Sequence, residues 1–230
     1  MNLPHTGDYI NIHTHGTDPE EGIFCLENLM VHENIKPLDK KGIAYSCGIH
    51  PWYITDTNYR DQLRSFADIA GDPNIVAIGE CGFDKLHGPS PDIQRLVFEE
   101  QVKIAMECSK PVIIHCVRSW DELLASHRRM NPSMPWLVHG FRRKTGLAEQ
   151  LIAKNMYLSF WFDFVIRPES AQLLKSIPAD RIFLETDGAE VDIRDIYSKV
   201  SVDLDMRVEE LRDLILKNYR RLFNLEKMKA

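Results

Sequence analysis

The sequence predicts an α/β protein, a distorted (β/α)8 TIM-type barrel with a reduced first β/α unit. Short, nearly all-apolar segments alternate with amphipathic segments of helical period along the chain. This alternation is typical of a parallel sheet that helices cover on both faces. Seven strands are clear and an eighth is weak. The length of 230 residues lies at the low end for this fold, about 200–250 residues.

The first predicted strand, Tyr9–His15, alternates apolar and polar residues with a period of two. Residues Ile23–Leu26 form a weaker strand candidate. The gap between them is too short for a parallel crossover that contains a helix, so we expect irregular pairing and a reduced first unit. Residues 27–39 receive no assignment.

From Gly42 onward, strands and helices alternate regularly. Short apolar runs mark the strands, and apolar residues at helical spacing mark the helices. The predicted strands are Gly42–Ile49, Asn74–Gly79, Pro111–Ile114, Trp136–Val138, Met156–Phe160 and Arg181–Thr186. The predicted helices are Asn58–Ala70, Pro91–Ser109, Ser119–Arg129, Leu147–Lys154, Pro168–Ser176 and Met206–Phe223.

Composition bounds the class of protein. Hydrophobic residues make up 44% of the chain, enough for a substantial core, and we expect one domain over residues 1–230. The net charge of −6 argues against broad electrostatic binding to nucleic acid or membrane, but a local basic site stays possible. No apolar run approaches the roughly 18–20 residues of a membrane span. Five cysteines without a CxxC pair indicate a reducing compartment, so we expect a cytoplasmic protein.

Ionisable residues stand at or just past the ends of the predicted strands. In a (β/α)8 barrel, the carboxyl ends of the strands converge on the face that carries the active site. An unpaired imidazole or carboxylate at such a buried position is costly, so a series of them indicates function. These residues are His13, His15, His50, Glu80, His115, His139 and Asp187.

The chemistry of this set indicates a metal site. His13 and His15 are two positions apart and point to the same side of a strand, which supplies half of a divalent-metal site. An isolated pair of this kind is more often a solvated strand end, so the metal site depends on further ligands elsewhere in the chain. The whole set has too many ligands for one tetrahedral ion and suits two divalent cations that share a carboxylate. Imidazole and carboxylate without thiolate fit Zn, Mn, Ni or Mg.

Short motifs along nearly the whole chain carry a family resemblance. They are His13-Thr14-His15, Gly48-Ile49-His50-Pro51, Ile78-Gly79-Glu80-Cys81-Gly82-Phe83-Asp84, Gln94 with Phe98, Gln101 and Ala105, Pro111-Val112-Ile113-Ile114-His115, Val138-His139-Gly140-Phe141, Tyr157-Leu158-Ser159-Phe160, Leu184-Glu185-Thr186-Asp187, and Asn218 with Arg221-Leu222-Phe223. Together they resemble the TatD-like metal-dependent deoxyribonucleases of the amidohydrolase superfamily. The family fold is a (β/α)8 barrel, in agreement with the pattern above.

The resemblance implies a role for each residue of the set. The implied metal ligands are His13, His15 and Asp187 for one ion, His115 and His139 for the other, and Glu80 as the bridge. His50 would face the scissile phosphate, and the implied catalytic residues are Asp187, Glu80 and His50. A metal-activated hydroxide would attack phosphorus, with Asp187 orienting the nucleophile or accepting its proton.

The chain departs from the family pattern mainly in the segments that would contact substrate. Asn11 replaces an aspartate two places before the first histidine, and Val117 replaces an arginine two places after His115. Arg142-Arg143 stand where Ser-Gly is usual. Gly188-Ala189-Glu190 replace Ser/Ala-Pro-Tyr, and the long loop that follows is largely absent. Hydrolase is therefore better supported than DNase.

Basic and aromatic residues near the strand ends are candidate substrate contacts. Arg118, Arg142 and Arg143 follow ligand-bearing strands and could bind phosphate, or could be solvated charges at helix starts. Trp52 and Trp161 could stack a nucleobase or pack against neighbouring loops.

Two acidic residues near the set have open roles. Asp84 could support a metal ligand through a hydrogen bond or cap its own loop. Glu185 could line the barrel interior or form a structural ion pair, and we assign it no catalytic role.

We expect a divalent-metal hydrolase of phosphodiester bonds, with DNA or another phosphate-containing substrate as its partner and no membrane partner. The alternative is a small-molecule amide, lactone or phosphoester hydrolase on the same barrel. The acidic charge and shortened loops favour that alternative, whereas Arg142, Arg143, Lys144 and His50 favour phosphate. A catalytically silent metal-binding protein is a third interpretation, which the retention of every ligand type argues against.

Overall fold

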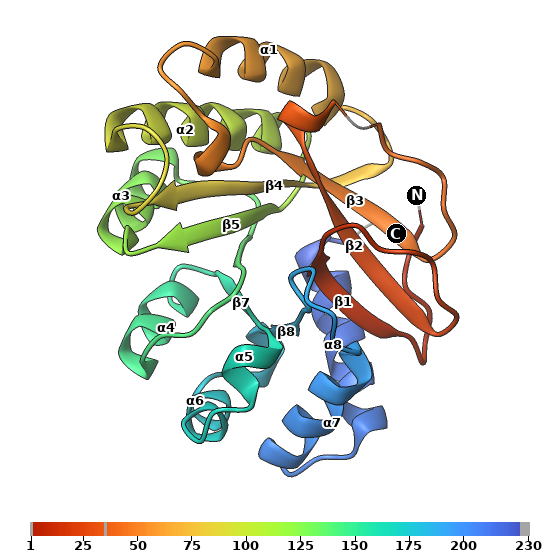
Figure 1. The fold of residues 1–230 in the computed structure, drawn as a ribbon. Helices are drawn as coiled ribbons and strands as arrows, with labels where there is room; N and C mark the ends of the chain where they lie inside the picture. The colour runs from red at the N-terminus through yellow and green to blue at the C-terminus, as the bar shows by residue number, and fades with distance from the viewer. Residues whose placement is uncertain (1, 35, 226–230) are drawn as a thin grey trace. The chain divides into compact units, whose positions relative to one another are not determined.

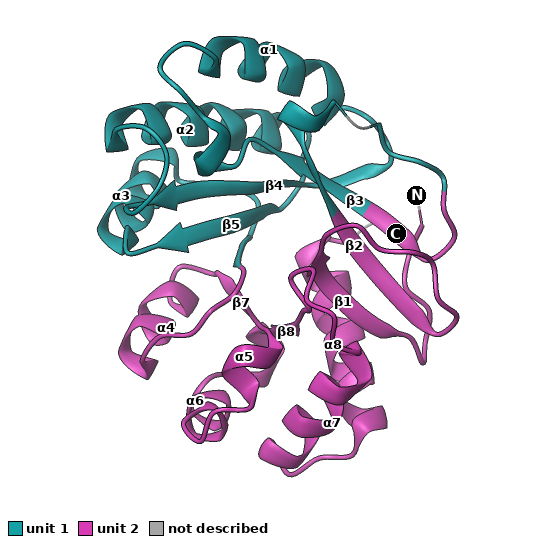
Figure 2. Ribbon diagram, viewed as in Figure 1, with its two compact units in different colours: residues 1, 28–39, 45–138 teal, residues 2–27, 40–44, 139–230 magenta. Residues whose placement is uncertain are grey.

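The computed structural model describes residues 2–34 and 36–225. The chain divides into two compact units, which Figure 2 shows in different colours. Unit 1 contains residues 28–39 and 45–138, and unit 2 contains residues 2–27, 40–44 and 139–230. We describe the geometry of each unit separately, and a single domain over the whole chain stays a prediction.

Eight strands alternate with helices, and the strands take sequence order from β1 to β8 in the sheet (Figure 1). The strand pairs within the units are parallel. The fold is a (β/α)8 barrel, as predicted. The strands are β1 Tyr9–Thr14, β2 Ile23–Met30, β3 Ile43–Gly48, β4 Ile75–Asp84, β5 Val112–Val117, β6 Trp136–Val138, β7 Tyr157–Phe160 and β8 Ile182–Leu184. The helices are α1 Tyr59–Ala70, α2 Pro91–Glu107, α3 Trp120–Met130, α4 Thr145–Ile152, α5 Phe162–Val165, α6 Ser170–Ser176, α7 Ile193–Asp203 and α8 Val208–Leu222, with 3-10 turns η1 Val31–Glu33, η2 Pro51–Tyr53 and η3 Ala179–Arg181.

The first β/α unit is reduced, as the sequence predicts. β1 and β2 pair in parallel, Tyr9 lies opposite Ile23, and the described residues between the strands form turns without a helix. The register shifts between Asn11 and Thr14, which is the irregularity expected from so short a connection. β2 continues four residues beyond the predicted end, because the polar residues Glu27 and Asn28 interrupt the apolar pattern but not the strand.

Strands β4 and β5 of unit 1 also continue beyond their predicted ends. Gly82 lies opposite His115 in the register, and a Cβ atom at Gly82 would lie 2.0 Å from the carbonyl oxygen of His115. Only glycine permits this approach of the two strands. Glu80 and His115 therefore lie inside paired strands, and the prediction that they stand at strand ends is wrong. The predicted strands are too short because glycine, cysteine and ionisable residues interrupt the apolar pattern, although both strands continue through them.

Two helices of unit 2 were not predicted, α5 and α7. α7 packs on β1, where the Tyr197 hydroxyl accepts a hydrogen bond from the Ile10 N–H (3.1 Å) and donates one to the Ile10 carbonyl oxygen (3.0 Å). Burial raises the pKa of Tyr197, so the phenol stays protonated and keeps both bonds.

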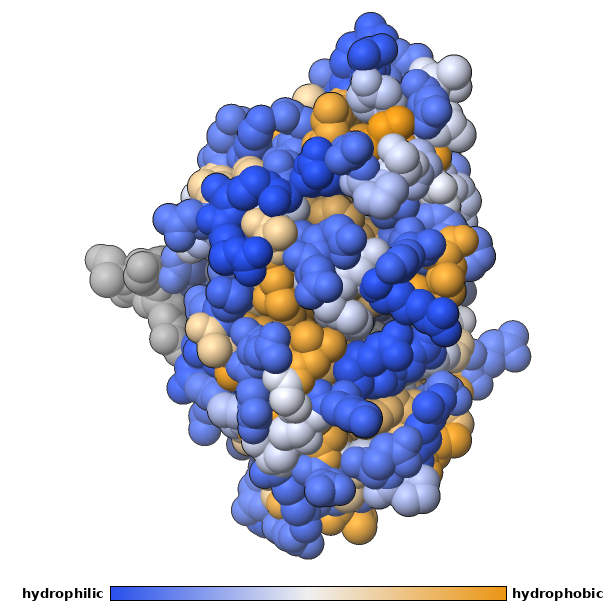
Figure 3. Space-filling view, turned by 90° about the vertical axis from the view of Figure 1, so that its left-hand side faces the viewer, coloured by the Kyte–Doolittle hydropathy of each residue, from blue (hydrophilic) through white to orange (hydrophobic). Residues whose placement is uncertain are grey.

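One face of the molecule is predominantly polar. Figure 3 shows a face on which hydrophilic side chains dominate and hydrophobic ones form small separate areas. None of the helices in the described part of the chain combines the length and the apolar character that crossing a membrane requires.

Candidate metal-binding site

Two histidines and one carboxylate converge in unit 2. His13 and His15 come from the end of β1, and Asp187 follows β8. The Nε2 atoms of His13 and His15 lie 3.5 Å and 3.7 Å from the same atom, Asp187 Oδ1. His13 is fully buried, whereas the side chains of His15 and Asp187 are 33% and 27% exposed. We call these three residues the unit 2 cluster.

Hydrogen bonds between β1 and the end of β8 fix this geometry. The Asn11 side-chain oxygen accepts from the Thr186 N–H (3.0 Å), and its amide nitrogen donates to Thr186 Oγ1 (2.8 Å). The Asp187 N–H donates to the His13 carbonyl oxygen (3.2 Å). Asp187 has a left-handed backbone, with φ of 53°, which turns the chain immediately after the strand. Asn11, which departs from the family pattern, is therefore a structural amide that uses both its acceptor and its donor.

Glu185 supports the region of His139, which directly follows β6. Its two carboxylate oxygens accept hydrogen bonds from the Gly140 N–H (2.5 Å) and from the Ser159 hydroxyl (2.5 Å). The Oε1 atom of this fully buried carboxylate lies 3.7 Å from His139 Nδ1. A carboxylate behind a histidine orients the imidazole toward whatever its other nitrogen binds. Glu185, to which we assigned no catalytic role, thus holds the backbone directly after His139 and faces its imidazole.

Unit 1 holds a second group of the same residue types, which we call the unit 1 cluster: His50, Glu80 and His115. The Oε1 atom of Glu80 lies 2.8 Å from His115 Nδ1 and 3.2 Å from His50 Nε2. All three residues are buried. His50 Nδ1 accepts a hydrogen bond from the Trp52 N–H (3.2 Å), so the ring proton lies on Nε2 and faces Glu80.

Asp84 holds the other side of His115. Its Oδ2 atom lies 3.2 Å from His115 Nε2 and accepts a hydrogen bond from the Trp52 indole N–H (2.6 Å). Its Oδ1 atom accepts from the backbone N–H groups of Leu86 and His87. Burial of Asp84 opposes its ionisation, but the hydrogen bonds from His115, Trp52 and Leu86 outweigh it and hold the pKa of this carboxyl well below its usual range. Both ring nitrogens of His115 therefore face carboxylate oxygens.

A buried amide holds the backbone of Glu80. Asn28, in β2, accepts hydrogen bonds on its side-chain oxygen from the Glu80 N–H (2.5 Å) and from the Ser46 hydroxyl (3.0 Å). Sequence reasoning missed Asn28. The only signal was a polar residue inside an apolar run, in a stretch that received no assignment.

The donor atoms of both clusters suit a divalent cation, but the spacing fits one only in the unit 2 cluster. Two ligands that each lie about 2.1 Å from one tetrahedral ion are separated by about 3.4 Å. The 3.5 Å and 3.7 Å separations of the unit 2 cluster are close to this value, and its ligand atoms all lie within 4.8 Å of one another. The unit 1 cluster also meets the 4.8 Å limit, but its shortest separation, 2.8 Å, is that of a hydrogen bond.

The predicted arginines are exposed and do not join either cluster. Arg142 lies over the Trp161 ring, 5.6 Å from its centroid, and its Nη1 atom lies 3.9 Å from Asp163 Oδ2. Arg118 and Arg143 are exposed, and the backbone of Arg118 is left-handed. Phosphate binding by Arg118, Arg142 and Arg143 stays a prediction.

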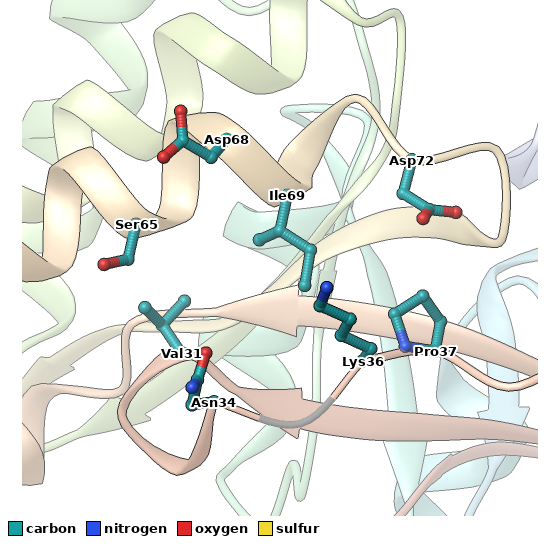
Figure 4. Close-up of a pocket in the computed structure, with 8 residues that line it drawn as sticks. All are labelled: Val31, Asn34, Lys36, Pro37, Ser65, Asp68, Ile69 and Asp72. Atoms are coloured by element: carbon teal, nitrogen blue, oxygen red, sulfur yellow. The ribbon is translucent and has the colours of Figure 1, made fainter.

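Each unit also contains a pocket. In unit 2, a pocket of about 370 Å³ includes His15 in its lining, and its other lining residues include Asp18, Glu20, Glu190 and Asp192. In unit 1, a pocket of about 450 Å³ lies between α1 and residues 31–37 (Figure 4). Among its described lining residues there is no predicted site residue.

Comparisons with known proteins agree with this picture. A model of the TatD related DNase family matches residues 23–224. The chain is 27% identical over 207 residues to the uncharacterized metal-dependent hydrolase YcfH of Escherichia coli K12, covering 82% of this chain and 76% of YcfH. It is 34% identical over 163 residues to the 3'-5' ssDNA/RNA exonuclease TatD of Cronobacter turicensis, covering 69% of this chain and 62% of that protein.

A solved structure supports the fold. The crystal structure of YjjV, a TatD homologue from Escherichia coli K12, matches with a TM-score of 0.76 at 20% identity. The match covers 96% of this chain and 99% of that chain. This match concerns the fold, a (β/α)8 barrel.

Proposed function

Because the chain belongs to the TatD related DNase family, it is a metal-dependent hydrolase that acts on ester bonds, and we propose that its substrate is single-stranded nucleic acid. The similar protein of Cronobacter turicensis, named a 3'-5' ssDNA/RNA exonuclease, supports this choice. The observation that carries the proposal is the position of two imidazole nitrogens at metal-ligand spacing around one oxygen of Asp187.

We propose that two divalent cations of the Zn, Mn, Ni or Mg class serve the reaction. His13, His15 and Asp187 would hold one, and His115 with Glu80 would take part in holding the other. That His139 ligates the second cation and that Glu80 bridges the two stay predictions from the family resemblance. When bound, such cations stabilise charge on a phosphoryl group and lower the pKa of water.

The chain's own residues would handle the protons. Asp187 is partly exposed, so it can accept the proton of an attacking water. The Nε2 atom of His50 lies 3.2 Å from Glu80 Oε1, so His50 would donate a hydrogen bond to a phosphate oxygen by exchanging Glu80 for that oxygen. Glu80 would keep the imidazoles of His50 and His115 in place. Its contacts with both rings support this role.

The cysteines support the cytoplasmic location that we propose. All five are free, and Cys25, Cys47 and Cys81 are buried. Burial raises the pKa of Cys25 to about 11 and that of Cys47 to about 12, so both thiols stay protonated at neutral pH and act as core residues. Free buried thiols of this kind are typical of proteins from a reducing compartment.

The pocket beside His15 favours a second candidate function, hydrolysis of a small uncharged or cationic ester or amide. Its lining includes four acidic residues. Arg194 binds the carboxylates of Glu20 and Asp192, and Lys40 Nζ lies 4.0 Å from Oδ1 of the fully exposed Asp18 side chain. A rim of this charge repels phosphate and accepts a neutral substrate of moderate size.

The test is release of nucleotides from end-labelled single-stranded DNA, with Mg, Mn or Zn added to protein whose metal content is measured. His115→Ala should lower the rate by at least about 100-fold, because losing a ligand costs more than the 10–100-fold typical of outer partners. His5→Ala, in an exposed histidine of the N-terminal segment, is the matched control and should keep wild-type activity. Metal-loaded wild-type protein without activity on DNA or RNA would contradict the proposal and favour the small-molecule function.

A further inference from the structure

Trp52 is exposed in an unusual position. It lies in η2, two residues after His50, and 49% of its surface is exposed, with the adjacent Tyr53 at 40%. Leaving an indole in water forgoes the free energy of its burial. The alternative that Trp52 packs under a neighbouring loop does not account for this exposure.

The indole is nevertheless held rigidly. Its N–H donates a 2.6 Å hydrogen bond to Asp84 Oδ2, and Asp84 is only 2% exposed. Asp84 is itself fixed by the N–H groups of Leu86 and His87. An exposed ring with a fixed edge loses little entropy when a flat ligand stacks on it, so it is preorganised as a platform.

The platform lies beside the unit 1 cluster. The Trp52 ring centroid is 5.0 Å from that of His50 and 5.8 Å from that of His115, with interplanar angles of 86° and 79°. The His87 ring, whose side chain is 62% exposed, lies 5.1 Å from Trp52 at a tilt of 51°. The two imidazoles of the cluster thus meet the indole in edge-to-face contacts, while part of the indole surface faces solvent.

We infer that Trp52 stacks the nucleobase next to the phosphate that the unit 1 cluster binds, an inference that rests on the proposed nucleic-acid substrate. A phosphate beside His50 is separated from the neighbouring base by one sugar, so base and indole are within reach of each other. Stacking suits every base, because each has a π face. Trp52 would therefore favour strand ends that carry a base, whatever the identity of that base.

The charge of the protein makes such a contact necessary. The net charge of −6 gives little general attraction for a polyanion, and Arg142 lies near Asp163 and Trp161. Stacking does not depend on phosphate neutralisation, so it supplies affinity that salt screens only weakly. Loss of one stacked base should raise KM by about 5- to 100-fold.

The experiment compares metal-loaded wild type, Trp52→Ala and Trp52→Phe on single-stranded DNA with intact bases and on the same DNA with one abasic residue at each of the three end positions in turn. In wild type, one abasic position should raise KM by about 5- to 100-fold. Trp52→Ala should raise KM on intact DNA by a similar factor and lose the discrimination. Trp52→Phe, which keeps an aromatic ring but not the N–H, should keep most of the discrimination between intact and abasic DNA. Tyr59→Ala, in a partly exposed aromatic residue of α1, is the control and should behave as wild type.

Each other outcome contradicts the inference. If Trp52→Ala lowers kcat equally on both substrates and still discriminates against the abasic residue, Trp52 acts only by positioning Asp84. If wild type cleaves intact and abasic DNA equally well, no base is stacked, although the proposed function stands. If wild type with bound metal cleaves neither, the proposed function and the stacking role are both wrong. Unchanged thermal unfolding of each variant confirms that the comparison concerns folded protein.

Discussion

The unit 1 cluster and the unit 2 cluster use the same chemical groups at different spacing. In unit 2, two imidazole nitrogens lie 3.5 Å and 3.7 Å from one carboxylate oxygen, which leaves room for an ion. In unit 1, the corresponding distances to Glu80 are 2.8 Å and 3.2 Å, and His115 also faces Asp84. The unit 2 cluster is thus spaced for a cation, whereas hydrogen bonds close the unit 1 cluster.

Burial explains the difference. Asp187 follows β8 in a turn and is partly exposed, so water can solvate it without a cation. Glu80 lies inside β4 and is only 3% exposed, so its charge needs partners at all times. A buried carboxylate must therefore bond to its neighbours when it holds no metal, while a partly exposed one can stay apart from them. We expect metal to enter the unit 2 cluster without rearrangement and the unit 1 cluster only by displacing a hydrogen bond.

The largest expected effect comes from Asp187→Asn, which removes the charge shared by the unit 2 cluster. Activity should fall by about 100- to 10,000-fold, the range for loss of a proton-transferring group. Metal analysis should show that the Asp187→Asn variant holds less metal than the wild type. Full metal content with normal activity would show that the 3.5 Å and 3.7 Å spacing has no role in catalysis.

An effect of intermediate size is expected on the free energy of unfolding, which should differ between substitutions in the two clusters. In metal-free protein, Glu80→Gln should lower the free energy of unfolding by about 1–3 kcal/mol, because it weakens charge-assisted hydrogen bonds in the core. Asp187→Asn should change it by less than about 0.5 kcal/mol, as expected for a partly exposed side chain. Urea titration followed by circular dichroism measures both. Equal effects of the two substitutions would mean that burial does not distinguish the clusters.

The smallest expected effect is that of Asn11→Asp, which restores the residue of the family pattern. Aspartate can still accept from the Thr186 N–H but cannot donate to Thr186 Oγ1 as the amide does. We expect a loss of about 1 kcal/mol in unfolding free energy, with metal content unchanged. Stabilisation by Asn11→Asp would show instead that the Thr186 hydroxyl donates and that the unit 2 cluster tolerates another charge.

The sequence predicted the fold class and most elements, because buried strands and amphipathic helices differ in period. It missed α7, although Ile193, Ile196, Tyr197 and Val200 have the spacing of a helix face and are buried. The family resemblance drew attention to a shortened loop there instead. α5, with four residues, is too short to leave a periodic pattern.

The candidate ligands could also be predicted, because ionisable residues near the ends of apolar runs are rare without a function. The residues that hold these ligands in place could not be predicted. Asn28 contacts Glu80 across 52 positions and Asn11 contacts Thr186 across 175, and such contacts depend on strand register. The sequence shows that Glu185 and Asp84 are acidic residues close to candidate ligands. Only the structure shows which histidine each one contacts.

The bonds between Tyr197 and Ile10 have a consequence for the order in which the chain is made. β1 leaves the ribosome before the helix that holds it, because Tyr197 lies 187 positions after Ile10. Thr186 and Asp187, which bond to Asn11 and His13, also follow β1 by most of the chain. The candidate ligands of β1 are thus positioned only after residues near the other end of the described chain have been synthesised.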